Sequence, residues 1–303
     1  MVRARTTNGV SPRVDLRAPT AAEDDVRDLV IRLTGTDAGI ESLRRATDAQ
    51  RRLRAMGSLG DWRHHVPEVV AAGDLSAWVF QTERALTGHP LTASSADIDV
   101  AHRDATAALR AIGALHAATA GPIDRAVAMQ DWVETRLAVV ARVATGTSAS
   151  REGLAIMADV RRVRDEVTDA VGEVRSAGWI HGDLWAANVL TDAAGTIQGF
   201  VDWDSAAADE LPEQDVLHLV LYARKLREHR PLGSVVADVL RDGWSPHDLG
   251  LLEHVVVTTG LARRPAVLLY WLRFVEANLR RQPHLERSPA WIDRNVTQVL
   301  ACR

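Results

Sequence analysis

The sequence contains one cysteine, one lysine and no long apolar run. Because Cys302 is the only cysteine, the chain can form neither an internal disulfide nor a zinc site built of cysteines. The eleven histidines include no HExxH pattern, which argues against a zinc hydrolase. The single lysine, Lys225, lies in YARKLRE and follows no glycine-rich loop, so a P-loop is excluded. A GxSxG motif is also absent, which argues against an α/β-hydrolase.

No segment has the length of a membrane span. The bulkiest apolar run, Ala266 to Leu272, stops at Arg273, well short of the ~20 residues that cross a bilayer. The opening residues Met1-Val-Arg-Ala-Arg lack the apolar core of a signal peptide. We therefore expect a cytoplasmic protein with no membrane partner.

The overall composition is that of a folded globular protein. Apolar residues make up 47% and charged residues 25% of the 303 residues, and this length favours about two domains or lobes. The net charge is −4, and the basic stretches lack interleaved aromatic residues. We therefore expect no nucleic-acid partner.

Strand and helix signals divide the chain unevenly. In the first part, strand-like pieces at 13–18, 26–33, 69–72 and 77–82 surround one helical stretch at 40–56. Helical periodicity dominates afterwards, at 101–118, 123–143 and 153–177 and again beyond residue 213. The pattern predicts an α+β protein with a small β-rich lobe over residues 1–88 and a large, mainly helical lobe over residues 89–303.

Two polar clusters interrupt the helical part. The first, HGDLWAANVL, begins at His181, and the second, GFVDWDSA, begins at Gly199. Between them a turn at 192–195 and a short strand predict a hairpin that brings Asp202 back beside Asn188. A carboxylate and an amide oxygen are ligands that Mg²⁺ accepts, with phosphate oxygens and water completing its shell.

These two stretches resemble the catalytic core of the aminoglycoside phosphotransferase and choline kinase superfamily, a branch of the protein-kinase-like fold. HGDLWAANVL is similar to the family's HGDxxxxN loop, and GFVDWDSA is similar to its strand-to-metal motif, with nineteen residues from Asp183 to Asp202. The resemblance implies a two-lobed kinase-like fold and the cofactors ATP, or GTP, and Mg²⁺. It also implies transfer of the γ-phosphate to a hydroxyl of a small molecule, such as a sugar, natural product, antibiotic or amino alcohol.

The same resemblance implies a role for each motif residue. Asp183 accepts or orients the proton of the substrate hydroxyl, and Asn188 and Asp202 hold Mg²⁺ against the nucleotide phosphates. His181 braces the loop. Asp215, in EQDVLHLV, supports the catalytic loop without reacting.

The phosphate-binding lysine of protein kinases has no counterpart here. VIRLTG, from Val30 to Gly35, resembles the choline-kinase branch, in which an arginine takes that place, so Arg32 is the candidate phosphate ligand. Its guanidinium can bind phosphate through two hydrogen bonds; the alternative is a solvated charge on a strand. An acidic partner for Arg32 is expected on the following helix, and spacing leaves Glu41 and Asp48 equally open.

The remaining nucleotide contacts are matched less closely. The stretch after the strand at 77–82 resembles the hinge between kinase lobes, whose backbone contacts the base, which makes Glu83 and Ala85 candidates. TTNGVSPRVDLRA places Gly9 and Ser11 where the family has a small-residue turn over the phosphates. This turn is the poorest match, and a chain that had lost nucleotide binding would be a pseudokinase that acts as a binding module.

Charge and aromatic residues bear on the phosphate acceptor. The segment from Arg263 to Arg303 contains eight arginines and three acidic residues. This excess of positive charge favours a neutral or anionic acceptor over a polycation. The alternative is that these charges only lie on solvated helix faces. Trp185 and Trp203 flank the catalytic acids and either face a sugar ring or a quaternary ammonium, or pack against neighbouring helices. A Ser or Thr of a natural-product precursor peptide is the alternative acceptor.

Overall fold

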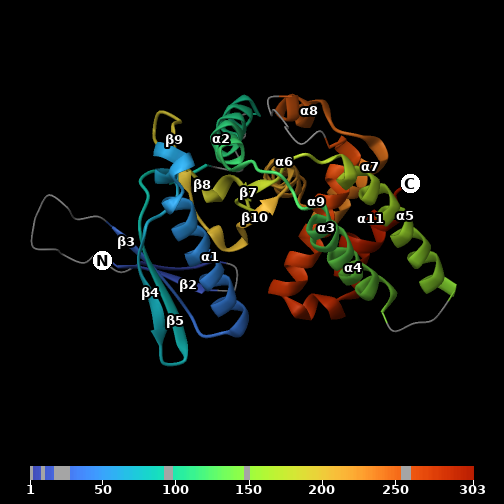
Figure 1. The fold of residues 1–303 in the computed structure, drawn as a ribbon, viewed down its shortest axis with the longest axis horizontal. Coiled ribbons are helices and arrows are strands. Elements are labelled where there is room, and N and C mark those ends of the chain that lie inside the picture. The colour runs from blue at the N-terminus through green and yellow to red at the C-terminus, as the bar shows by residue number, and fades with distance from the viewer. Residues whose placement is uncertain (1–2, 8–10, 17–27, 92–97, 147–150, 254–260) are drawn as a thin grey trace, which may run out of the picture.

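The computed structural model describes residues 3–7, 11–16, 28–91, 98–146, 151–253 and 261–303. Over these residues the chain forms a small lobe around a twisted sheet and a large helical lobe beside it (Figure 1), as the sequence predicts. The division at residue 88 stays a prediction; Gly88 lies between the last strand of the small lobe and the first strand of the next sheet.

The small lobe is a five-stranded antiparallel sheet in the order β1-β2-β3-β5-β4. Its strands are β1 (Arg3–Thr7), β2 (Ser11–Leu16), β3 (Leu29–Thr34), β4 (Val69–Leu75) and β5 (Trp78–Arg84). Strand β5 pairs with β3 on one side and with the edge strand β4 on the other. Because side chains alternate along a strand, Arg32 and its partner in register, Gln81, point to the same buried face.

The helix α1 (Asp37–Ala55) covers the buried face of this sheet. It starts where the Thr36 hydroxyl accepts a hydrogen bond from the Gly39 amide and Asp37 follows in the first turn, both favourable at a helix N-terminus. Leu43, Ala46 and Leu53, at three- and seven-residue spacing, are buried. A 3₁₀-helical segment, η1 (Gly57–His65), then leads to β4.

The large lobe consists of helices and two small sheets. The helices are α2 (Ile98–Thr119), α3 (Arg125–Ala128), α4 (Thr135–Thr145), α5 (Arg151–Glu173), α6 (Glu213–Glu228), α7 (Leu232–Asp242), α8 (Pro246–Glu253), α9 (Arg263–Arg281), α10 (Pro289–Ile292) and α11 (Gln298–Leu300). A π-helical stretch, η2 (Met129–Glu134), joins α3 to α4 into one continuous rod. In the described residues no helix is long and apolar enough to cross a membrane.

The two small sheets carry the motif residues between the lobes. Strand β7 (Gly178–Ile180) pairs with β10 (Ala207–Glu210), while β8 (Val189–Thr191) lies between β6 (His89–Pro90) and β9 (Ile197–Phe200). The hairpin β8–β9 is the one that the turn at 192–195 predicts, with Val189 opposite Phe200.

Two buried clusters hold the lobes. The larger one lies within the helical lobe and is formed by α4, α5, α7 and α9 around the fully buried Trp271. The smaller one joins Leu53 of α1, Ile112 and Leu115 of α2, and Phe200 and Trp203 beside the motifs. The apolar contacts that connect the two lobes are therefore the same contacts that pack behind the acidic motifs.

Candidate active site

The loop that carries HGD is held from behind by Asp215, in the first turn of α6. The Asp215 Oδ2 atom accepts from the His181 amide at 2.8 Å, and its Oδ1 atom accepts from the Gly182 amide at 2.7 Å. His116 of α2 lies 3.0 Å from the same Oδ2. Burial alone would raise the pKa of Asp215, but hydrogen bonds from His116 and the Gly182 amide outweigh it and lower that pKa. Asp215 is fully buried, which fits a supporting residue that never meets substrate.

His181 connects this loop to the second motif. Its Nε2 atom lies 2.9 Å from the carbonyl oxygen of Val201, and its ring packs 4.7 Å from that of Trp203. Complete burial lowers the pKa of His181, so the neutral imidazole donates to the carbonyl. This contact links the loop to the second motif, and the bracing role that the resemblance implies for His181 stays a prediction.

Arg273 of α9 joins the same two segments on their other side. Its Nη1 atom donates to the Gly182 carbonyl at 2.9 Å and its Nη2 atom to the Ser205 carbonyl at 2.7 Å. Gly182 has φ +79°, and a Cβ there would lie 2.1 Å from the Ser205 oxygen. The close approach of the two segments therefore requires glycine at position 182.

Asp183 lies at the open end of the loop. Its carbonyl oxygen accepts from the Asn188 side-chain amide at 2.9 Å, and its Oδ1 atom lies 3.2 Å from Nε2 of His218 on α6. Burial opposes ionisation, but His218 outweighs it and lowers the pKa of Asp183. With 28% of its side chain exposed, Asp183 is an ionised carboxylate that an incoming hydroxyl can reach.

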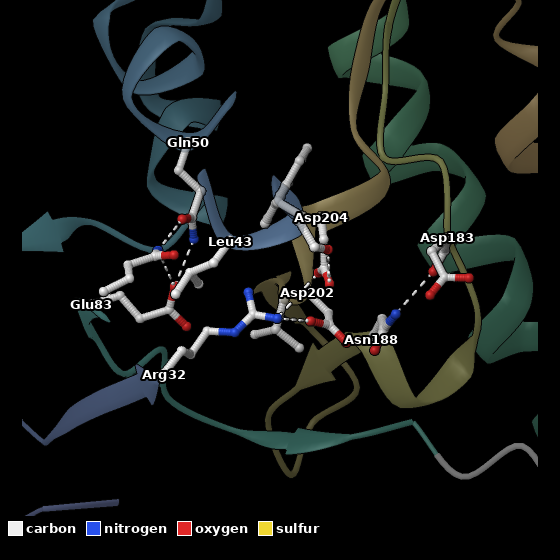
Figure 2. A network of polar contacts seen from close by, with 12 residues as sticks. Arg32, Leu43, Gln50, Glu83, Asp183, Asn188, Asp202 and Asp204 are labelled. Atoms are coloured by element: carbon white, nitrogen blue, oxygen red, sulfur yellow. Dashed lines mark hydrogen bonds and ion pairs between the residues drawn. The ribbon is translucent and has the colours of Figure 1, made fainter. Parts of the chain in front are cut away.

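The β8–β9 hairpin brings the two proposed metal ligands together. The Val201 amide donates to the Asn188 carbonyl at 2.9 Å, so Asp202, the next residue, stands beside Asn188 (Figure 2). Asp202 has the left-handed conformation φ 73°, ψ 57°, which is uncommon for a residue with a side chain and concentrates at functional sites. Hairpin geometry thus places the two side chains as the spacing predicts.

The donor set fits Mg²⁺. The Asn188 amide nitrogen is used by the Asp183 carbonyl, so the Asn188 Oδ1 atom is the one left to bind a cation. The Asp202 carboxylate supplies the second hard oxygen. Among the described residues no three His, Cys, Asp or Glu side chains form a metal cage, and a cation held by few protein ligands and by phosphate oxygens is the way Mg²⁺ is usually bound.

Arg32 reaches across from β3 to this acidic pair. Its Nη2 atom lies 2.6 Å from Asp202 Oδ1 and 3.2 Å from Asp204 Oδ1, and Ser42 of α1 donates to the other Asp204 oxygen at 3.0 Å (Figure 2). Burial raises the pKa of Asp204, but Arg32 outweighs it, so the net pKa is well below the usual range. Only 8% of the Arg32 side chain is exposed, which excludes the alternative of a solvated strand charge.

The prediction that the acidic partner of Arg32 lies on the following helix was wrong. Glu41 pairs with Arg45, and Asp48 lies 3.6 Å from Arg52, both one turn along α1 on its outer side. The face of α1 toward the sheet is occupied by Leu43, Ala46 and Gln50 instead, because an amphipathic helix turns its charged positions to solvent. The partners of Arg32 come from the second motif, 170 residues away.

The hinge residues are placed differently from one another. The Glu83 side chain points inward, where its Oε2 atom accepts from Gln50 at 2.7 Å and from Gln81 at 3.1 Å. The Ala85 amide is bound to the Asp28 carbonyl at 2.8 Å, so it cannot serve the base while that bond stands. Leu86 is the next residue, and its amide makes no hydrogen bond with any described residue.

The glycine-rich turn is described only in part. Gly9 lies outside the described residues, and Ser11 is the first residue of β2, opposite Thr7. A strand does precede the turn: β1, of five residues.

The two tryptophans near the acids have unequal settings. Trp203 is completely buried and donates to the Phe200 carbonyl at 2.8 Å, so it packs the core and faces no ligand. Trp185 is half-buried and its ring lies 5.2 Å from that of Tyr222 on α6. Packing therefore accounts for Trp203, while Trp185 keeps part of its ring accessible.

Some of the basic residues counted in the helical lobe are paired with acidic side chains. Arg224 pairs with Glu228 at 2.7 Å, and Arg230 pairs with Asp238. Further pairs join Arg264 to Glu166 and Arg280 to Glu276, and Arg273 serves two backbone carbonyls. Counting charges along the sequence therefore overstates how basic this lobe is toward an acceptor.

The site residues missed from the sequence include His116, His218 and Arg273. Each is a polar residue inside an otherwise apolar helical stretch, in ALHA, DVLHLVL and YWLRFV respectively. A polar side chain on a helix face that must be buried needs a partner, and that signal is visible without a structure, although it does not identify the partner.

The site between the lobes combines an arginine on a sheet, an HGD loop and an acidic pair that follows a hairpin. This combination defines a kinase-like phosphotransferase fold. The sequence matches the model of the phosphotransferase enzyme family over residues 20–249, so the chain belongs to this family. No curated protein matches the sequence.

Solved structures share the fold at low sequence identity. An apo thermostable mutant of aminoglycoside phosphotransferase APH(4)-Ia is 17% identical, with a TM-score of 0.54 over 99% of this chain and 94% of that one. The macrolide 2'-phosphotransferase MphH of Brachybacterium faecium is 14% identical, with a TM-score of 0.52 over 98% and 91%. Aminoglycoside 2'-phosphotransferase-IIIa, as its GDP complex, is 15% identical, with a TM-score of 0.55 over 99% and 91%.

Proposed function

We propose that this protein transfers the γ-phosphate of a nucleoside triphosphate, in the presence of Mg²⁺, to a hydroxyl group of a small molecule. The observation that carries the proposal is the convergence of Asp183, Asn188 and Asp202 opposite the buried Arg32. One carboxylate accessible to an alcohol, two hard oxygen ligands and one permanent cation are the groups that phosphoryl transfer requires.

The donor side of the site is built from Arg32, Asn188 and Asp202. Mg²⁺ bound to Asn188 and Asp202 would supply positive charge to the phosphate oxygens. Arg32 uses only Nη2 for its two carboxylates. Within the described residues the other N–H groups of its guanidinium make no hydrogen bond, so they are available to a phosphate.

The acceptor side is built around Asp183. When the acceptor oxygen attacks the γ-phosphorus, its O–H bond breaks and the proton passes to the Asp183 carboxylate. A new O–P bond forms while the bond to the β-phosphate oxygen breaks, and the nucleoside diphosphate leaves. Catalysis of this kind depends on positioning and charge, without a covalent enzyme intermediate.

The nucleotide base is proposed to lie against the segment after β5. Because the Ala85 amide is engaged by Asp28, we move the base-contacting position from Ala85 to Leu86. Glu83 contributes through the buried network with Gln50 and Gln81 that fixes the end of β5. ATP is the proposed donor, with GTP as the alternative.

The acceptor is proposed to be a hydroxylated natural product, antibiotic or sugar. Structural neighbours include a ternary complex of aminoglycoside phosphotransferase APH(4)-Ia with ADP and hygromycin B, and macrolide 2'-phosphotransferases. In this chain, ion pairs within the helical lobe leave little net charge from Arg224 or Arg230. Against burial, which raises the pKa of Asp183 and of Asp204, the charge of Arg281 helps to lower it. This charge still favours a neutral or anionic acceptor, and polycations enter the same screen as the alternative.

Nucleotide binding is tested first, by thermal unfolding with Mg²⁺ and millimolar ATP or GTP. A ligand at about 100 times its Kd stabilises the folded state by about 2.7 kcal/mol, so the unfolding temperature should rise clearly. Asp202→Asn should remove the part of this rise that depends on Mg²⁺. No rise with either nucleotide would support a pseudokinase binding module instead.

Transfer is tested next, by screening hydroxylated compounds for Mg²⁺-dependent release of nucleoside diphosphate. Asp183→Asn should lower kcat by about 10² to 10⁴ and leave the nucleotide-induced thermal shift in place, because Asp183 does not contact the proposed metal. Turnover by Asp183→Asn at the native rate would refute the assignment. Transfer only to a Ser- or Thr-containing peptide would replace the small-molecule acceptor by a peptide.

A further inference from the structure

Two buried side chains lie in series next to Asp183, from helices α6 and α9. His218 of α6 places Nε2 3.2 Å from Asp183 Oδ1, and Tyr270 of α9 places its hydroxyl 3.0 Å from the other ring nitrogen, Nδ1. The His218 side chain is 9% exposed, and Tyr270 is buried. Neither residue can touch an acceptor, so any effect they have on catalysis must pass through Asp183.

The contacts fix the position of the proton on His218. Burial is the largest cause that raises the pKa of Tyr270 well above its usual value, so its hydroxyl stays protonated and is available to donate to Nδ1. A lone pair on Nε2 facing a carboxylate would be repelled, so Nε2 carries the hydrogen. The buried Nε2 makes no well-aligned hydrogen bond with any described residue, and it lies at an ion-pair distance of 3.2 Å from Asp183 Oδ1, which makes this oxygen its candidate acceptor.

The ring of His218 is also fixed in orientation. Tyr222, one turn further along α6, stacks on its face with ring centres 5.0 Å apart and an angle of 27°. Tyr270 contacts it from the side at 5.9 Å and 58°. A ring held by two aromatic neighbours and one hydrogen bond loses little further freedom when it binds the carboxylate.

We propose that His218 and Tyr270 are positioning residues for the catalytic base: Tyr270 holds His218 in the Nε2–H tautomer, and His218 engages Asp183 Oδ1 so that Oδ2 alone faces the acceptor hydroxyl. The inference rests on the proposed function, because it takes Asp183 as the group that receives the hydroxyl proton. The proton goes to Oδ2, and His218 keeps its own hydrogen throughout.

The tautomer is measured without any turnover. Full-length protein labelled with ¹⁵N-histidine is studied by long-range ¹H–¹⁵N correlation at about pH 8.5, well above the ordinary pKa of an imidazole, and His218 is assigned from the signal that disappears in His218→Gln. Expected is the Nε2–H tautomer in the native protein and in Tyr222→Phe. Tyr270→Phe, which removes the donor to Nδ1, should shift His218 toward a tautomer mixture.

Kinetics supply the second readout, with water as the acceptor and inorganic phosphate release from Mg·ATP as the signal. Tyr270→Phe and His218→Leu should lower kcat by about tenfold to a hundredfold and leave KM for ATP unchanged within about twofold. His218→Gln, which keeps an N–H donor, should recover most of the loss. Tyr222→Phe makes the same atom change beside the same ring, where the Tyr222 hydroxyl makes no bond to His218, and should act as native.

Two results would overturn the inference. One is an Nδ1–H tautomer in the native protein, or an unchanged tautomer in Tyr270→Phe. The other is a loss of kcat in Tyr222→Phe as large as in Tyr270→Phe, which would mean that packing matters and the hydrogen bond does not. Absence of phosphate release from the native protein would instead refute the proposed function, while the tautomer would still decide whether Tyr270 directs His218 onto Asp183.

Discussion

Arg32 is expected to hold the acidic pair in place until the nucleotide arrives, and Arg32→Met tests this. The substitution keeps a long apolar side chain but removes a cation that lies within ion-pair distance of both Asp202 and Asp204. The two carboxylates then lie beside each other without that cation, while the Ser42 hydroxyl still donates to Asp204. Their mutual repulsion and partial burial should destabilise the folded state.

The size of the effect follows from burial. Removing one partner of a fully buried ion pair costs about 3 to 5 kcal/mol, whereas an exposed pair is worth about 0 to 1 kcal/mol. Arg32 is 8% exposed but its partners are 30% and 22% exposed, so water screens part of the loss. We expect about 2 kcal/mol, which for a chain of this length lowers the unfolding temperature by about 4 to 8 °C.

The assay is thermal unfolding without nucleotide at neutral pH, with and without millimolar Mg²⁺. Mg²⁺ should restore part of the lost stability in Arg32→Met and do less for the native protein, since Arg32 no longer competes for Asp202. Arg44→Met is the matched control: it breaks the Arg44–Asp74 pair at 2.9 Å, whose side chains are 61% and 67% exposed, and should cost less than about 1 kcal/mol.

An unfolding temperature for Arg32→Met that equals that of Arg44→Met, in the absence of Mg²⁺, would refute the reasoning. It would mean that the carboxylates find water or another partner as good as Arg32. An equal Mg²⁺ response in the native protein and Arg32→Met would contradict competition for Asp202.

Two further predictions concern the loops around the acids. Gly182→Ala should destabilise the folded state by about 3 kcal/mol or more, because the new Cβ would lie 2.1 Å from the Ser205 oxygen. Gly195→Ala has a similar φ of +83° but no atom within 4 Å of the new Cβ, so it should cost about 1 to 2 kcal/mol. Equal losses of unfolding free energy for the two variants in urea would contradict this. The lowered pKa of Asp204 means that the folded state binds its proton less readily than the unfolded state, so this contribution is present above about pH 4 and lost as pH falls further. Between pH 7 and pH 3 the native protein should therefore lose more unfolding free energy than Asp204→Asn, and identical losses would count against the Arg32–Asp204 pair.

The catalytic loop and the hairpin were predictable because their geometry is local. Asp183 and Asn188 are five residues apart on one loop, and a tight turn at 192–195 fixes the register that returns Asp202 to Asn188. Turn residues and strand alternation are properties of short segments. The order of strands and helices, and hence the two-lobed architecture, followed from the same local signals.

The environment of each site residue was not predictable in this way. Glu41 and Asp48 were reasonable partners for Arg32 by spacing, but the partners came from a segment 170 residues away. The basic character assigned to the helical lobe was also reduced once Arg224 and Arg230 proved to be paired with acids four and eight residues further along the chain. A charge count along the chain contains no information on which charges meet.

The sequence, through its motifs, determined which groups are proposed to do the chemistry: a carboxylate for the hydroxyl proton, two oxygen ligands for a cation, and an arginine in a chain with no lysine on its sheet. Only the tertiary structure decided what each group touches, with Arg273 joining the two motif loops, His116 and Asp215 fixing the loop backbone, and His218 lying next to Asp183. The physical reason is that turns and strands are specified by neighbouring residues, whereas the partner of a buried polar group is specified by helices that pack together from distant parts of the chain.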